Sequence, residues 1–217
     1  MSDIFQEVDE EVRRERLKQL WDRYGTLFVA LAFLIVAAIG GWRAYQWWDA
    51  KKAAENGVRF ESALALASEG KSADAEAAFG RIAAEGTSGY RILARFQEAA
   101  ELARRDPVAG VKAYDALAAD SGVTALLQDL ARVRAGLIMI DTALPEELRT
   151  RLEPVTAPGR AFRHSARELM AFASWRAGNA TETKRWVDMI VADAESPQAI
   201  RQRVEMLSAL TTSEAKS

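Results

Sequence analysis

The stretch Phe60–Gly86, FESALALASEGKSADAEAAFGRIAAEG, is repeated in outline by Phe96–Gly122, FQEAAELARRDPVAGVKAYDALAADSG. Each begins with a helix-forming segment, passes through a tight turn, and continues with a second segment that reaches Ala-Ala shortly before a glycine. A glycine after an apolar-periodic run is typical of a helix end. Both stretches therefore predict a pair of antiparallel helices, and Phe60 and Phe96, which begin them, lie 36 positions apart.

The overall composition also favours helices. Alanine contributes roughly forty residues, far above its usual share, whereas the chain has only 5 prolines and few β-branched residues. Alanine is the strongest helix former, and sheets are rich in β-branched and aromatic residues. The composition therefore predicts an all-α fold.

Aromatic residues recur with nearly the same period. Phe79 and Tyr114 lie 35 positions apart, and Trp186 follows after 72 more, which is two periods of 36. The second helix keeps part of a small–aromatic–small series in Ala75-Phe79-Ile82, and this pattern resembles a tetratricopeptide repeat. The side chains predicted to pack within the repeats are Phe60, Phe79, Phe96, Tyr114 and Trp186.

The repeat pattern is incomplete, so an alanine-rich helical bundle remains open as the alternative. The period lapses over residues 123–159, where Leu126–Ile140 and Pro145–Leu152 form an off-pattern pair. Both interpretations predict a helical domain over residues 59–211, and a disordered tail is expected at 212–217. We expect the repeats to stack into an α-solenoid of helical hairpins.

A single apolar segment precedes this domain. Residues 24–42 read YGTLFVALAFLIVAAIGGW, without a charge between Arg23 and Arg43. At about 1.5 Å per residue the segment reaches about 28 Å, close to the thickness of a bilayer core. We therefore predict one transmembrane helix over residues 24–43, preceded by a tail at 1–23 and followed by a helical connector at 44–58.

The residues at both ends of this segment favour a membrane span over two alternatives. Aromatic side chains, which are enriched at membrane interfaces, occur at both ends of the segment: Trp21, Tyr24, Trp42, Tyr45, Trp47 and Trp48. A buried core helix would carry a polar stripe, which this segment lacks. A cleaved signal peptide would not follow an acidic stretch of this length, and Gly41-Trp42-Arg43 is no cleavage site.

Basic residues predict the orientation of the span. Five lysines and arginines precede it and four lie close to its other end (Arg43, Lys51, Lys52 and Arg59), and the longer C-terminal part translocates largely regardless of charge. We expect the N-terminal tail in the cytoplasm and the C-terminal domain in the periplasm of a bacterium, with the span in the inner membrane.

The residue types that the sequence contains argue against most enzyme classes. The chain has no cysteine and one histidine, which argues against a thiol nucleophile and a zinc site, and its net charge of -2 argues against nucleic-acid binding. Phosphate-binding, nucleophile-elbow and metalloprotease motifs are absent. We therefore expect no catalytic, cofactor-binding or metal site and no cofactor.

We expect the remaining polar residues to lie at the solvent-exposed surface. His164 is interpreted as an ordinary surface histidine, and acid pairs such as Glu98 with Glu101 as solvated ion pairs. Arginines within residues 91–105, 132–134 and 160–167 are interpreted as a solvated helical face, with contact to an acidic peptide or a lipid headgroup as the alternative.

The full arrangement resembles the YfgM-like ancillary subunits of the Sec translocon. The residues that carry the resemblance are Arg23-Tyr24-Gly25, Gly40-Gly41-Trp42, Trp47-Trp48, Ala65-Leu66-Ala67 and Ala75–Phe79. The resemblance implies a membrane-anchored periplasmic scaffold whose partners are translocon subunits and periplasmic chaperones. The alternative is a single-pass regulator that couples a periplasmic domain to a cytoplasmic partner through residues 1–23.

Overall fold

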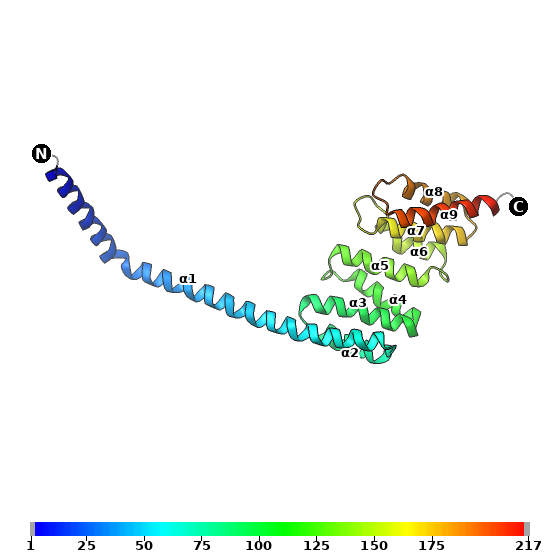
Figure 1. The fold of residues 1–217 in the computed structure, drawn as a ribbon, viewed down its shortest axis with the longest axis horizontal. Coiled ribbons are helices and arrows are strands. Elements are labelled where there is room, and N and C mark those ends of the chain that lie inside the picture. Colours follow the sequence, from blue (N-terminus) through cyan, green and yellow to red (C-terminus); the bar gives the residue numbers. More distant parts are fainter. Residues whose placement is uncertain (1–2, 215–217) are drawn as a thin grey trace. The chain divides into compact units, whose positions relative to one another are not determined.

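The computed structural model describes residues 3–214, with side chains from residue 21 to 211 and at Lys18, and this part of the chain is all-α (Figure 1). Between residues 3 and 214 no strand is present. The elements are α1 (Asp3–Ser68), α2 (Ser72–Glu85), α3 (Ser88–Arg105), α4 (Pro107–Ala119), α5 (Ala125–Met139), α6 (Pro145–Leu152), the 3-10 turn η1 (Glu153–Val155), α7 (Arg163–Arg176), α8 (Ala180–Val191) and α9 (Gln198–Glu214).

The chain divides into two compact units, Met1–Ala54 and Glu55–Ser217. The first unit consists of helix α1 alone, so the predicted tail, span and most of the connector belong to one helix. Most of the side chains of the predicted tail lie outside the described residues. Of the tail expected at 212–217, α9 includes residues up to Glu214, and the rest lies outside the described part.

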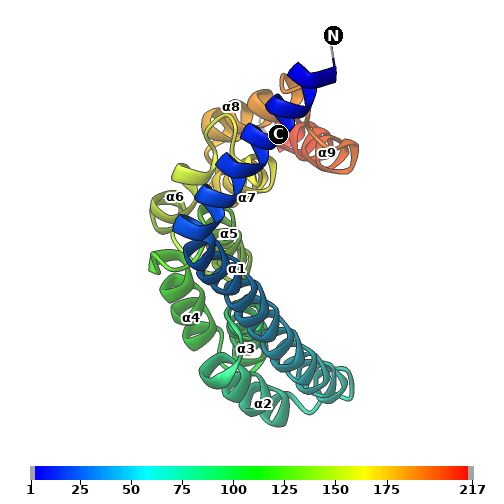
Figure 2. The same cartoon turned by 90° about the vertical axis from the view of Figure 1, so that its left-hand side faces the viewer.

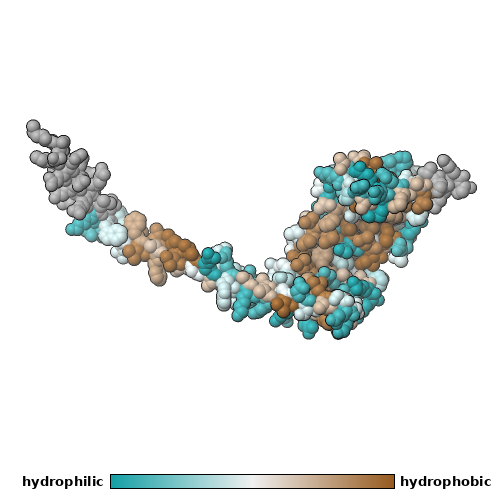
Figure 3. Space-filling model, viewed as in Figure 1, coloured by the Kyte–Doolittle hydropathy of each residue, from teal (hydrophilic) through white to brown (hydrophobic). Residues whose placement is uncertain are grey.

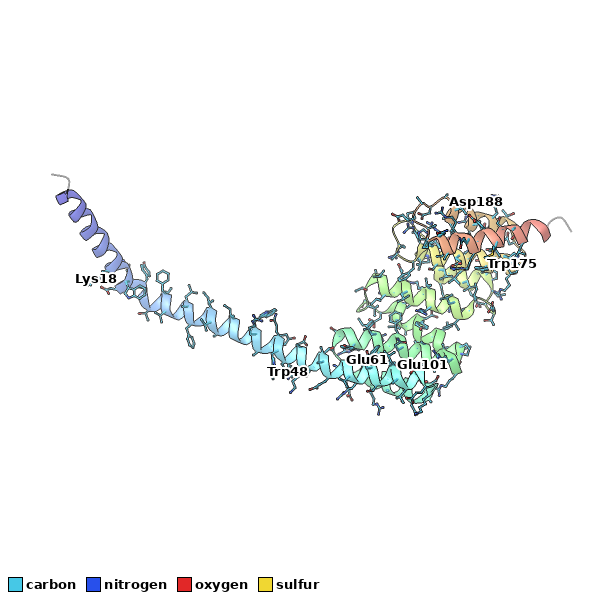
Figure 4. The ribbon with its side chains drawn as sticks, in the orientation of Figure 1. Lys18, Trp48, Glu61, Glu101, Trp175 and Asp188 are labelled. Carbon is cyan, nitrogen blue, oxygen red and sulfur yellow. The ribbon has the colours of Figure 1, made fainter. Side chains whose placement is uncertain are left out.

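Helix α1 is long and apolar enough to span a membrane. The most apolar 18-residue window has a mean hydropathy of 2.2, and only 6% of it is buried. Leu27 and Phe33 are 64% and 75% exposed, which is the opposite of a core helix. The six aromatic residues predicted for the membrane interface are all exposed, and the Lys52 ammonium lies 3.7 Å from the centroid of the Trp48 ring (Figure 4).

The second unit is built from helical hairpins. The last part of α1 pairs with α2, and the following hairpins are α3–α4, α5–α6 and α7–α8, with α9 against the last one. Gly70 and Gly178 adopt φ angles of 76° and 71° at the turns of the first and last hairpins, a conformation that favours glycine. Asp106 caps the start of α4, where its carboxylate accepts a hydrogen bond of 3.0 Å from the Ala109 amide.

The predicted aromatic period produces two equivalent ring contacts. Phe60 lies 5.3 Å from Phe79 in the first hairpin, and Phe96 lies 6.0 Å from Tyr114 in the second, between ring centroids. Phe79 is fully buried and Tyr114 is 4% exposed. Trp186 on α8 is also buried, at 1% exposure. Each second helix of these three hairpins therefore buries an aromatic ring.

The off-pattern stretch forms a hairpin with a shortened second helix. Helix α6 has only 8 residues and buries Leu148 and Leu152 where the other hairpins bury a ring. Gly136 on α5 makes room for this arrangement, because a Cβ there would lie 3.1 Å from the Leu152 side chain. The period lapses in the sequence because aliphatic side chains replace the aromatic ring.

The hairpins stack side by side with a curvature that separates their two faces. Helices α3, α5, α7 and α9 lie along one side of the second unit, and α2, α4, α6 and α8 along the other (Figure 2). The hydrophobic core is correspondingly divided into three clusters along the stack.

Small residues set the separation of α3 and α4. A Cβ built on Gly110 would lie 2.3 Å from the Cβ and 2.5 Å from the Cα of Ala103, so the two backbones approach too closely for any side chain at Gly110. Close packing of this kind leaves little freedom for larger residues, because the obstructing atoms include backbone.

We expect Gly110→Ala to destabilise the repeat domain, because α4 must move away from α3. Overpacking of this kind costs about 1–3 kcal/mol, which corresponds to several degrees in Tm. Gly89→Ala is the matched control, since a Cβ there meets nothing within 4 Å in the first turn of α3. Thermal denaturation followed by circular dichroism checks both variants, and equal Tm values would contradict the packing argument.

Candidate protein-binding groove

The helices α3, α5, α7 and α9 line a groove that contains two adjoining cavities. The first, of about 320 Å³, lies between α3 and α5 above Tyr114. The second, of about 400 Å³, is bounded by α5, α7 and α9. Leu137 on α5 lines both cavities, so they adjoin at this residue, and we refer to the two together as the groove. Figure 3 shows hydrophobic residues gathered over the middle of this face, with hydrophilic residues on either side.

The groove side chains follow helical spacing. Arg134, Leu137 and Asp141 occur at intervals of three and four along α5 and its C-terminal turn, which places them on one side of the helix. Phe172 and Trp175 take the corresponding place on α7. Figure 4 labels Glu101 on α3 and Trp175 on α7, the helices on either side of α5.

The second cavity is largely apolar, and three of its four charged side chains are held within the chain. Both carboxylate oxygens of Glu168 accept hydrogen bonds from Arg203, at 2.6 and 2.9 Å, and this carboxylate raises the pKa of the Arg203 guanidinium. Arg176 donates hydrogen bonds to the backbone carbonyls of Asp141 and Ala143. The cavity therefore offers apolar surface from Leu169, Phe172 and Trp175, with the exposed Asp141 carboxylate as its one charge without an ion pair among the described residues.

The first cavity has a different character. It is lined by Ala100 and Ala103 and by two arginines, Arg104 and Arg134. Tyr114 lies at the base, where its hydroxyl donates a 3.3 Å hydrogen bond to the Phe96 carbonyl, and burial raises the pKa of this phenol.

Of the groove residues, the sequence drew attention only to Tyr114 and to Arg104 and Arg134, for which contact with an acidic peptide was the alternative interpretation, and it gave no signal for the apolar ones. Exposed apolar residues on a helix, such as Leu137 at 48% exposure, look the same in sequence as core residues. The five aromatic residues predicted for repeat packing lie outside the two cavities except Tyr114. First helices of stacked hairpins line the concave side, and that rule locates the groove once the hairpins are assigned.

A charged cluster at the N-terminal end of α7 contradicts two predictions from the sequence, one about the arginines and one about His164. Asp193 accepts hydrogen bonds from Arg163 at 2.9 Å and from Arg167 at 3.1 Å, and the Arg163 bond holds the pKa of this carboxyl well below its usual range. Arg163 and Arg167 are therefore not part of a solvated helical face. His164 is 7% exposed between them, so it is not a surface histidine.

Two further acidic residues, Glu101 and Asp129, are buried beside arginines. Glu101, expected in a solvated ion pair, is 3% exposed and its carboxylate lies 3.7 Å from Arg104. Asp129 on α5 is 2% exposed and pairs with Arg132 at 3.0 Å and with Arg160 at 3.3 Å. The second pair ties the loop before α7 to α5. Two of these pairs are local, three residues apart on one helix, but their burial depends on neighbouring helices that the local sequence does not reveal, and the Arg160 pair joins two separate elements.

Ser196, His164 and Asp193 lie close together without forming a catalytic triad. The Ser196 hydroxyl donates to the Ile190 carbonyl at 2.6 Å, so at its 3.0 Å contact with His164 Nδ1 it accepts the imidazole proton. The basic Nε2 atom then points away from the serine, which leaves the hydroxyl without a base. No group of three acidic or histidine side chains in the described residues could hold a metal ion.

We expect the imidazole of His164 to titrate below the ordinary pKa of 6.5, because burial and the Arg163 charge both disfavour the protonated ring. The depressed pKa gives stability that is complete above 6.5 and is lost as the pH falls through the folded-state value. The chain has one histidine, so NMR of its ring carbon reports this residue alone. The urea-unfolded chain is the control at about 6.5, and equal folded and unfolded values would contradict the burial argument.

Residues 18–206 match the family model of the tetratricopeptide repeat-like domain, a match that includes the apolar part of α1 as well as the helical hairpins. No curated protein and no solved structure matches this chain. The matched region covers most of the sequence, and the stacked hairpins with their recurring buried rings have the architecture that the family model describes. This chain therefore belongs to the tetratricopeptide repeat-like domain family.

Proposed function

We propose that this chain is an inner-membrane protein whose periplasmic repeat domain binds proteins beside the Sec translocon and assists their translocation or chaperoning. The observation that carries the proposal is the groove across α3, α5, α7 and α9, which presents apolar side chains at the surface. Repeat domains of this architecture are protein-binding scaffolds, and an exposed apolar groove is typical of a site for a protein segment.

Helix α1 supports the membrane part of the proposal. Its apolar side chains are exposed along the predicted span, and a bilayer is the environment that would cover them. The aromatic rings at both ends have the distribution of interface anchors. Confinement to one membrane raises the local concentration of the groove near a membrane partner, so that modest affinity suffices.

The resemblance to YfgM-like subunits supports the choice of partners. It favours translocon subunits, periplasmic chaperones and proteins that emerge from the channel. The described residues contain no candidate metal cluster, and the one serine–histidine contact described above lacks a free base. A binding role is therefore better supported than an enzymatic one.

A photocrosslinking amino acid at Leu137 or Arg104 is expected to capture translocon subunits, chaperones or emerging proteins in intact membranes. The same amino acid at Val108 on α4 or Glu146 on α6, both exposed on the opposite helices, is the control and should capture much less. Leu137→Arg should weaken capture from position 104 about tenfold, because it places a charge in the apolar groove. Equal capture from all four positions would contradict the groove as the binding site.

Alkaline phosphatase fused after residue 211 is expected to be active, because the repeat domain is proposed to be periplasmic and the enzyme is active only there. A fusion after residue 20 is the matched control and should be inactive. An inactive C-terminal fusion of normal abundance, measured by immunoblot, would show that the proposed orientation is wrong.

A further inference from the structure

The two cavities of the groove differ in charge, and this difference indicates what kind of segment fits them. Arg134 is exposed and forms no ion pair with any described residue. Arg104 is 62% exposed in its side chain and has one long contact, of 3.7 Å, to the buried Glu101. The other oxygen of Glu101, Oε2, has no hydrogen-bond partner within the described part of the chain. The first cavity is therefore lined by two arginines and by no acidic residue, since the buried Glu101 is not among its lining residues.

Most other arginines of the repeat domain behave differently. Arg95 pairs with Asp120 at 2.6 Å, Arg105 with Glu76 at 2.5 Å, and Arg151 with Asp115 at 2.9 Å. In the second cavity Arg203 is held by Glu168. Four arginines line the groove, and Arg134 differs from Arg104, Arg176 and Arg203 because it forms neither a hydrogen bond nor an ion pair with any described residue. Its location suits an acid supplied by a ligand, and an arginine binds a carboxylate with two parallel hydrogen bonds.

The second cavity complements this charge with apolar surface. Leu169, Phe172 and Trp175 line it, both of its arginines are held within the chain, and its remaining charge is the Asp141 carboxylate, which would repel an acid. A large aliphatic or aromatic side chain is the group that such a cavity accepts at least cost, because burial of a charge without a partner is expensive. Leu137 is shared, so a segment that enters both cavities crosses α5 at this residue.

We propose that the groove recognises a protein segment in which an acidic side chain and a large apolar side chain are about three residues apart. This inference rests on the proposed function. The acid pairs with Arg134 and Arg104, and the apolar side chain enters the cavity lined by Phe172 and Trp175. The spacing follows from geometry: packed helices lie about 8–10 Å apart, and an extended chain advances about 3.3 Å per residue.

Selection of random dodecapeptides on the full-length protein in lipid nanodiscs tests this proposal. Wild-type protein should enrich peptides that carry Asp or Glu two to four positions from Leu, Ile, Met, Phe or Trp. Arg134→Glu should reverse the charge preference to Lys or Arg. Arg81→Glu on α2 is the matched control: it reverses an exposed arginine outside the groove and should leave the wild-type preference unchanged. Circular dichroism confirms that each variant is folded.

The outcomes separate this inference from the proposed function. Leu137→Arg should abolish enrichment. If enriched peptides depend on Leu137 but show no acidic preference, or if the preference persists in Arg134→Glu, the inference is wrong and the groove still binds protein. If wild-type protein enriches nothing above empty nanodiscs, both proposals fail. If Arg134→Glu chiefly lowers cosedimentation with phosphatidylglycerol vesicles and leaves the selected peptides unchanged, the arginine serves a lipid headgroup and the inference is overturned.

A synthetic copy of the most enriched peptide allows the contribution of its acidic side chain to the binding affinity to be measured. Replacement of its acid by the corresponding amide should weaken binding about tenfold in fluorescence anisotropy, because a charge-assisted hydrogen bond is lost. The same replacement should not weaken binding to Arg134→Glu and should strengthen it, because it removes the repulsion between two carboxylates. A loss of equal size in both proteins would mean that the acid does not pair with Arg134, which contradicts the proposal.

Discussion

A helical hairpin of this length cannot bury its own apolar face, and the rest of the structure depends on that constraint. Each hairpin gains a core only by packing against its neighbours, so the ring pairs Phe60–Phe79 and Phe96–Tyr114 form within hairpins while the clusters extend across the next helix. The contact of Gly110 with Ala103 shows how closely α3 and α4 pack where small residues meet. First and second helices then occupy different sides of the stack, and the groove lies along the first.

The hairpins were predictable because they depend on local signals. Turn glycines, the cap at Asp106 and the recurrence of one aromatic ring per second helix all appear in the sequence at the correct intervals. The third hairpin was recognised only as an off-pattern pair, because Leu148 and Leu152 fill the place of a ring and Gly136 accommodates them. A substitution of aliphatic for aromatic side chains preserves the packing and hides the period.

The polar residues were predicted less well, because their environment is set by distant elements. Arg163 and Arg167 read as a solvated face from their spacing, yet Asp193 lies about thirty positions away and brings them together with His164. Arg104 and Arg134 have the same local sequence character and remain exposed in the groove. No pattern within one helix distinguishes the two sets, so the candidate site emerged only when neighbouring helices were placed beside each other.

The division of the core has a mechanical meaning for the groove. Met139, in the last turn of α5, is the side chain that packs against both the second-hairpin cluster and the larger C-terminal cluster. A methionine adapts its shape easily, because its chain is unbranched and its thioether is polarisable. The two clusters therefore meet at the end of α5 through a side chain that tolerates small changes in shape. Leu137 lies two residues before Met139, so the groove crosses α5 next to this junction, and a small change in the packing of Met139 would alter the spacing of the helices that line the groove.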